Sequence, residues 1–210
     1  MIDIAQLAPL MRGLKLTLEV FTYTLIASIP LGLLFAFIQQ KSPKIIRVLI
    51  QGYVYLFRGT PLLLQMMFVF FGLPFIGIVL DRFPAAIVTM IANYAAYFIE
   101  IFRGGLNSIP EGQYESLKVL SVKPLVGIRR VILPQLWQIV MPSVGNEVIS
   151  LIKDTALVYV LGLEELLKVG RAMSNSQASL IPFVYVGVIY LIITGITTLV
   201  LRRIEHYLYR

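Results

Sequence analysis

The stretch LIPFVYVGVIYLIITGITTLVL, residues 180–201, decides the fold, because its 22 consecutive residues carry no charge. A helix needs about 20 predominantly apolar residues to cross the hydrocarbon core of a bilayer. Apolar stretches of similar length recur upstream, at residues 16–38, 62–80, 85–102 and 136–161. The sequence therefore predicts an all-α polytopic membrane protein with five transmembrane helices.

The overall composition also favours a membrane protein. Apolar residues make up 58% of the 210 residues and charged residues 14%, whereas soluble domains contain about 45–50% apolar and roughly 25% charged residues. Residues 1–210 are expected to form a single transmembrane domain, with a loop of mixed charge at residues 162–179. The first apolar stretch lacks a small-residue cleavage site, so no cleavable signal peptide is expected.

Lys and Arg residues are distributed unevenly between the two ends of the predicted spans. With five spans, 12 of the 18 lie on one side, five lie on the other, and Lys153 lies inside a span. Positively charged loops face the cytoplasm, so the N-terminus is expected outside, and the C-terminus and a loop at residues 104–134 in the cytoplasm. Membrane orientation, rather than nucleic-acid binding, then explains the net charge of +7.

Residues 45–57, between the first two spans, form an amphipathic segment with Arg47 and Gln51 on its polar side. This pattern predicts an interfacial or slanting helix. The segment Arg58-Gly59-Thr60-Pro61 breaks the helix, and Pro61 suits the first turn of the next one.

The fourth span carries three charges, each of which costs about 2.5–3.5 kcal/mol at the bilayer centre on insertion scales. Glu147 and Asp154 lie seven residues apart and share a helix face, which Ser143 and Ser150 extend. Lys153, next to Asp154 in sequence, is expected to pair elsewhere or snorkel. Two interpretations of this polar face stay open: a seam between helices, and a substrate pathway or gate.

The third span has a weaker polar pattern. Asn93, Tyr97 and Glu100 follow one another at helical spacing, and Glu100 is expected to pair with Arg103 near the cytoplasmic end. Thr60 and Gln65, on either side of Pro61, are further polar residues that could contribute to the same cavity. The candidate residues of the pathway or gate are Thr60, Gln65, Asn93, Glu147, Ser150 and Asp154.

Residues that support enzymatic or metal chemistry are scarce. The chain has no cysteine, and its one histidine, His206, lies in the charged tail, so a disulfide or a His/Cys metal site is excluded. Glu147 and Asp154 are about 10 Å apart along a helix, too far for an acid dyad within one subunit. The Gly-x-x-x-x-Gly-Lys-Ser/Thr phosphate loop is absent, so energy for transport must come from another chain.

The loop at residues 104–134 contains a short helical segment. The sequence Ser108-Ile109-Pro110-Glu111 is typical of a helix start, with Ser108 as the N-cap. Leu117 and Leu120 are expected on one side of this helix. Because so short a helix is marginal by itself, it is expected to rest on the membrane surface or on a soluble partner.

The same loop resembles the "EAA" loop of ABC-importer permeases. That pattern is Glu-Ala-Ala, three residues, Gly, nine residues and Ile-x-Leu-Pro. The matching residues here are Tyr114-Glu115-Ser116-Leu117, Ser121 and Val131-Ile132-Leu133-Pro134. Ser116 and Leu117 replace the two alanines, Ser121 replaces the glycine, and Val131 replaces the isoleucine.

Other segments resemble polar amino-acid permeases, of the histidine, arginine and glutamine type. They are RGTPLLLQ at residues 58–65, EIFRGGL at 100–106, IPEGQ at 109–113 and GNEVISLIKDTAL at 145–157. The resemblance covers about residues 17–203, and several segments occur in the right order. It implies the MetI-like permease fold and a transporter subunit, not an enzyme, in a bacterial cytoplasmic membrane.

The resemblance also implies partners. These are a second permease subunit, identical or homologous, two ATP-binding subunits, and an extracytoplasmic amino-acid-binding protein. ATP and Mg²⁺ would belong to the ATPase, with no cofactor on this chain. The residues implied to couple to the ATPase are Glu111, Gly112, Tyr114, Glu115, Ser116, Lys118, Leu120 and Ser121. A stand-alone secondary transporter or channel is the main alternative, but the long cytoplasmic loop and the lack of an inverted repeat count against it.

Overall fold

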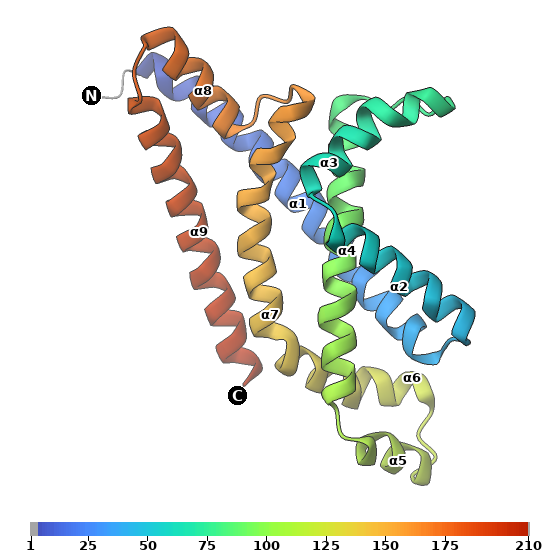
Figure 1. The fold of residues 1–210 in the computed structure, drawn as a ribbon. Coiled ribbons are helices and arrows are strands. Elements are labelled where there is room, and N and C mark those ends of the chain that lie inside the picture. The colour runs from blue at the N-terminus through green and yellow to red at the C-terminus, as the bar shows by residue number, and fades with distance from the viewer. Residues whose placement is uncertain (1–3, 210) are drawn as a thin grey trace.

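The computed structural model describes residues 4–209, and within that range it contains helices and turns but no β-strand (Figure 1). The four longest helices are α1 (Ile4–Lys41), α4 (Arg82–Ser108), α7 (Leu133–Asp154) and α9 (Ile181–Leu208). In Figure 1, α7 lies between α4 and α9, and α1 crosses behind them obliquely. The all-α prediction is confirmed.

Three of the described helices are long and apolar enough to cross a membrane: α1 from Leu7 onward, α4 and α9. A fourth crossing is formed if α2 (Lys44–Gly59) and the segment Leu62–Ile76 count as one broken span, since they are bent by 105° at the break. The helix α7, 22 residues long, is not among these spans, and polar residues interrupt its apolar sequence. The number of five spans therefore stays a prediction.

The predicted second span, residues 62–80, is not one regular helix. It begins as α3 (Leu62–Met67), continues as a π-helical turn, η1 (Phe68–Gly72), and ends in a 3₁₀ turn, η2 (Leu73–Ile76). Pro74 has no backbone N–H to donate to an earlier carbonyl, so regular α-helical hydrogen bonding does not resume after the π-helical turn. Gly77 then reverses the chain with a φ of 84°.

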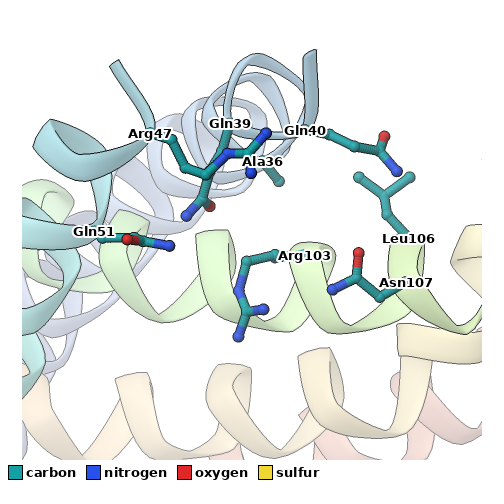
Figure 2. A pocket seen from close by; sticks show the side chains of 8 residues that line it. All are labelled: Ala36, Gln39, Gln40, Arg47, Gln51, Arg103, Leu106 and Asn107. Carbon is teal, nitrogen blue, oxygen red and sulfur yellow. The ribbon is translucent and has the colours of Figure 1, made fainter. Parts of the chain in front are cut away.

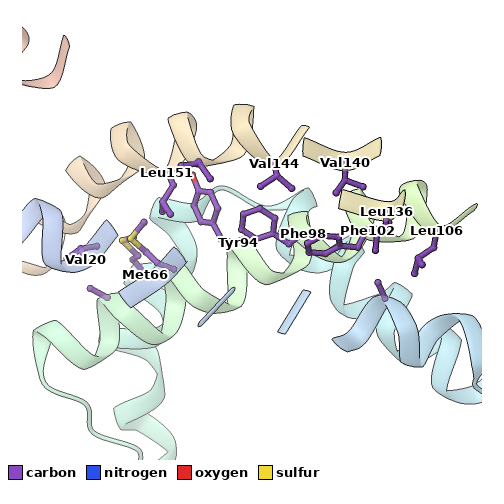
Figure 3. Close-up of a cluster of buried hydrophobic side chains, with 14 of the residues drawn as sticks. Val20, Met66, Tyr94, Phe98, Phe102, Leu106, Leu136, Val140, Val144 and Leu151 are labelled. Carbon is purple, nitrogen blue, oxygen red and sulfur yellow. The ribbon is translucent and has the colours of Figure 1, made fainter. Parts of the chain in front are cut away.

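A hydrophobic core joins α1, α4 and α7. Close contact between α1 and α4 depends on Gly32, where a Cβ atom would lie 2.4 Å from the Cβ of Phe98. On its other side, α4 buries a row of aromatic side chains against α7 (Figure 3). One of them, Phe102, lies edge-on to Trp137 of α7. The labelled core side chains are Val20, Met66, Tyr94, Phe98, Phe102, Leu106, Leu136, Val140, Val144 and Leu151.

The predicted loop at residues 162–179 contains a helix, α8 (Leu166–Gln177), that follows a 3₁₀ segment, η4 (Thr155–Leu161). Glu165 caps α8 by accepting hydrogen bonds of 2.6 Å from the N–H groups of Leu167 and Lys168. The hydroxyl of Tyr190 in α9 also donates to this carboxylate, at 3.3 Å. Burial raises the pKa of the Glu165 carboxyl, and these hydrogen bonds oppose the rise.

The linking segment between α4 and α7 is shorter than the predicted loop at residues 104–134. It contains α5 (Glu111–Val119) and α6 (Pro124–Gly127), and a π-helical turn, η3 (Ile128–Ile132), leads directly into α7. The prediction of Ser108 as N-cap is wrong: Pro110 occupies that position. The Ser108 hydroxyl instead donates to the carbonyl of Gly104, because α4 continues through residue 108.

Candidate functional site

The break between α2 and α3 lies at Thr60-Pro61, where the last carbonyls of α2 have no helical partner. Two side-chain amides compensate. The carbonyl oxygen of Phe57 accepts hydrogen bonds from Gln65 Nε2 at 2.9 Å and from Asn93 Nδ2 at 3.0 Å. Asn93 Nδ2 also donates to Gln65 Oε1 at 2.9 Å. These bonds give a partly buried carbonyl the partners that the break takes from it, and so hold the break in shape.

Beside this break lies a partly open cavity of 400 Å³, lined by the α2–α3 link, α4 and α7. Five of the six predicted pathway residues line it. The exception is Gln65, whose amide is directed to the break instead. The lining residues are Thr60, Pro61, Leu62, Asn93, Tyr94, Tyr97, Glu147, Ser150, Lys153 and Asp154.

All three charges of α7 line this cavity. The hydroxyl of Tyr94 donates to Asp154 Oδ2 at 2.8 Å. Within the described residues, no ion pair shorter than 4.0 Å involves Glu147, Lys153 or Asp154. The cavity therefore presents two carboxylates and one ammonium group whose charges the protein does not pair directly. Such a site can bind a ligand that itself carries both signs of charge.

Lys153 was expected to pair elsewhere or snorkel; it forms no ion pair within the described residues and lines the same cavity as Asp154. Adjacent residues on an ideal helix point about 100° apart, but the cavity is wide enough to receive both side chains. The helix also changes to 3₁₀ geometry at Thr155. Ser143, in contrast, is exposed and does not line the cavity, because the cavity begins at Glu147.

Tyr94 was not recognised from the sequence. Its role depends on contact between α4 and α7, and sequence spacing within one helix does not reveal such a contact. Tyr97 did belong to the polar pattern of the third span, together with Asn93 and Glu100. Of these three, only Glu100 is not among the residues that line the cavity.

Glu100 instead forms an ion cluster next to the cavity. Arg103 donates to both carboxylate oxygens of Glu100, from Nε at 2.9 Å and from Nη2 at 2.7 Å, as predicted. Arg58 Nη1 lies 3.6 Å from the same carboxylate and its guanidinium is 5.2 Å from the centre of the Tyr97 ring. The charges of the third span are thus paired within the protein.

Most of the predicted coupling residues form an exposed surface at α5. Tyr114 is the exception, since its hydroxyl is buried without a hydrogen-bond partner and its ring packs on the core. Leu117 packs against Gly127, while Leu120 is 72% exposed. The prediction that these two leucines lie on one side of the helix is therefore wrong. The exposed coupling residues are Glu111, Gly112, Glu115, Ser116, Lys118, Leu120 and Ser121.

Ser121 has a φ of 50°, in the left-handed region that favours glycine. Its N–H donates to the Lys118 carbonyl, and the N–H of Val122 donates to the Leu117 carbonyl, both at 3.0 Å. This is the hydrogen-bonded turn with which many helices end. The substitution of glycine by serine at this position has left the turn intact.

Known proteins share both the sequence pattern and the fold of this chain. The family model described as the binding-protein-dependent transport system inner membrane component matches residues 28–206. The chain belongs to this family. The permease is therefore a multi-pass inner-membrane component of a binding-protein-dependent transport system.

Similar proteins are named as amino-acid permeases. The permease is 34% identical over 206 residues to the arginine transport system permease protein ArtQ of Bacillus subtilis, covering 96% of this chain and 93% of that protein. It is 36% identical over 199 residues to the glutamine transport system permease protein GlnP of Escherichia coli, covering 93% and 91%. The permease is thus the membrane component of an ABC amino-acid importer.

Solved structures confirm the MetI-like fold. The crystal structure of an amino acid ABC transporter with histidines matches with a TM-score of 0.85 at 27% identity and covers 99% of both chains. An inward-facing structure of the MetNI methionine ABC transporter matches with a TM-score of 0.81 at 20% identity, which shows a common fold alone.

Proposed function

We propose that the cavity at the α2–α3 break is the amino-acid site of the translocation pathway. The observation that carries this proposal is the set of three unpaired charges on α7, placed together in a cavity that the α2–α3 link, α4 and α7 line. An α-amino acid is a zwitterion, so its ammonium group fits Glu147 or Asp154 and its carboxylate fits Lys153. Intramembrane charges of this kind typically mark substrate pathways.

The charges that line the cavity predict which kind of substrate side chain it favours. Two carboxylates and one ammonium line the site, so one carboxylate remains when both charges of the zwitterion are matched. That carboxylate favours a basic or hydrogen-bond-donating side chain. A polar amino acid is therefore the proposed substrate, in agreement with the names of the arginine and glutamine permeases.

The exposed surface of α5 is the proposed docking site for a separate ATPase subunit. Val119 is 84% exposed and Leu120 72%, next to the charged Glu115 and Lys118, a combination that suits a protein partner. Two permease subunits, identical or homologous, would present two such helices to two ATPases that hold ATP and Mg²⁺. An extracytoplasmic binding protein would deliver the amino acid from the opposite side.

The proposed arrangement has residues 1–210 as one transmembrane domain in the cytoplasmic membrane of a bacterium. Its N-terminus lies outside and its C-terminus and α5 lie in the cytoplasm. The preference of Lys and Arg for the end of the bundle that carries α5 supports this orientation.

Uptake of radiolabelled arginine and glutamine into proteoliposomes containing the complete transporter tests the site. Asp154→Asn and Glu147→Gln should each reduce uptake at least tenfold while the amount of folded transporter stays unchanged. Glu164→Gln, at an exposed position outside the cavity, is the matched control. Unchanged uptake by both cavity variants would reject the proposed site.

A further inference from the structure

A second polar cavity lies at the end of the bundle near α5. The last turns of α1 and α4 and the first two turns of α2 line this cavity of 240 Å³, which is open to one side, and Figure 2 shows the lining side chains. Nothing in the proposed transport pathway uses it. Its lining residues are Ala36, Gln39, Gln40, Arg47, Gln51, Arg103, Leu106 and Asn107.

Gln39 is the unusual member of this lining. Only 3% of the residue is exposed, and neither Oε1 nor Nε2 of its side chain has a hydrogen-bond partner. Buried amides are almost always hydrogen-bonded in folded proteins, so an amide left without partners requires an explanation. Both amide atoms are closed to solvent, so a ligand in the cavity supplies the missing partner when the Gln39 side chain turns toward it.

The chemistry of the lining specifies the charge of that ligand. Two guanidinium groups and four side-chain amides surround the cavity, and no carboxylate lines it. Arg103 is already paired with Glu100, but Arg47 takes part in none of the ion pairs within the described residues. In Figure 2 the guanidinium of Arg103 is turned away from Gln39, Gln40 and Arg47, which leaves Arg47, among the described residues, as the free guanidinium of the lining. Guanidinium and amide N–H donors together suit the oxygens of a phosphate.

We propose that this cavity binds the phosphate group of an anionic phospholipid in the leaflet on the side of α5. The cavity is lined by the end of α1, the start of α2 and the end of α4, at the end of the bundle that the proposed orientation puts at the cytoplasmic head groups. Apart from Lys44, the remaining exposed surface of the first turns of α2 is apolar, formed by Ile45, Ile46, Val48 and Leu49. Basic pockets between helices at this level bind anionic lipid head groups.

The apolar surface of α2 is the reason to choose a lipid over other phosphate or carboxylate ligands. Free phosphate would contact only the polar cavity, whereas a phospholipid also places acyl chains against the exposed side chains of α2. A carboxylate from an ATPase docked on α5 would first meet a neighbouring cavity of 550 Å³, which α5 itself lines. The phospholipid therefore fits both the polar and the apolar part of the surface.

The test uses the complete transporter, delipidated in detergent and titrated with dioleoyl phosphatidylglycerol, dioleoyl phosphatidylcholine or inorganic phosphate. Native mass spectrometry and the thermal midpoint report binding. Phosphatidylglycerol should bind at least tenfold more tightly than phosphatidylcholine and raise the thermal midpoint by several degrees.

Arg47→Gln should weaken phosphatidylglycerol binding at least tenfold. Lys44→Gln, which removes the same charge from the same helix end outside the cavity, should change it less than twofold.

Gln39→Leu gives a second, opposite readout. Without lipid this variant should have a higher thermal midpoint than the original protein, because it removes two unpartnered polar atoms. With phosphatidylglycerol its midpoint should rise by less than that of the original protein. A merely structural role for Gln39 would lower the midpoint in both conditions.

Three outcomes would overturn the proposal. The first is equal weakening of phosphatidylglycerol binding by Arg47→Gln and Lys44→Gln. The second is an equal thermal shift with inorganic phosphate alone, which would assign the cavity to a free anion. The third is loss of ATPase co-purification in Arg47→Gln with lipid binding unchanged, which would assign it to a protein carboxylate.

Discussion

Two clusters of charged residues in the helical bundle differ in whether the protein itself supplies ion-pair partners for them. In α4, Glu100 is paired with Arg103 at 2.7 Å and with Arg58 at 3.6 Å. In α7, Glu147 and Lys153 line a cavity of 400 Å³ and form no ion pair within the described residues. Both clusters were visible in the sequence as polar patterns in apolar spans. The difference is that one has its partners inside the protein and the other faces space for a ligand.

The two clusters are expected to serve different purposes, one the stability of the fold and the other transport. A charge whose partners belong to the protein contributes to the folded state, and its removal leaves an unpaired charge in the bundle. A charge that faces a ligand cavity can be neutralised without that penalty, so its removal should affect transport instead. Substitutions in the two clusters should therefore change different measured quantities.

The largest effect on stability is expected for Glu100→Ala. It leaves two arginines without their carboxylate, and because the cluster is partly exposed we expect a loss of about 2–3 kcal/mol, below the range for fully buried pairs. Unfolding in detergent, followed by circular dichroism, measures it. The double variant Glu100→Ala/Arg103→Ala should lose less than the single one. Equal stability of Glu100→Ala and the original protein would mean that the ion pairs of Glu100 do not stabilise the folded state.

Asn93→Ala should have the next largest effect, because Asn93 both lines the cavity and holds the helix break. Loss of its hydrogen bonds to Phe57 and Gln65 is expected to destabilise the protein by about 1–3 kcal/mol. The matched control is Asn146→Ala, at an exposed position on α7. If both variants unfold at the same denaturant concentration, the amides do not hold the break.

Glu115→Lys should leave stability unchanged within about 0.5 kcal/mol, since this residue is exposed on α5. We expect it to weaken ATPase association roughly tenfold, or about 1.4 kcal/mol. Co-purification of the ATPase at increasing salt concentration measures the effect. Tyr114→Phe is the control, because it removes only a buried hydroxyl without a partner. Undiminished association in Glu115→Lys would contradict docking at this residue.

The smallest effect is expected for Ser121→Gly. Glycine adopts the left-handed conformation at this position without the steric penalty of serine, so the protein should gain about 1 kcal/mol. Ser116→Gly, within α5, should instead lose up to about 1 kcal/mol. Thermal unfolding distinguishes the two signs. A loss of stability in Ser121→Gly would mean that the turn does not need this conformation.

Much of the fold was predictable because the length of an apolar stretch of sequence directly predicts a membrane-spanning helix. Residues 180–201 lie within α9 apart from Leu180, and residues 85–102 lie within α4. The boundaries were less accurate, since α1 begins at Ile4 rather than at residue 16. The helix α8 was missed because its cap, Glu165, is fixed by contacts with other helices that spacing does not reveal.

The candidate site was predictable to the extent that it depends on one helix face. The spacing of Glu147, Ser150 and Asp154 placed them together, and all three line the cavity. Gln65 and Lys153 were misjudged for opposite reasons. Gln65 is directed to carbonyls that the break leaves unpaired, and Lys153 enters a cavity whose width only the packing of three helices determines.

Chemical protection of a single cysteine tests the central claim that the α7 cavity holds the amino acid. The chain has no native cysteine, so Ser150→Cys reports on the cavity and Ser143→Cys, outside it, serves as the control. In the assembled transporter, maleimide labelling at position 150 should slow at least fivefold when arginine or glutamine is present, with no change at position 143. Equal labelling rates at position 150 with and without either amino acid would contradict the account.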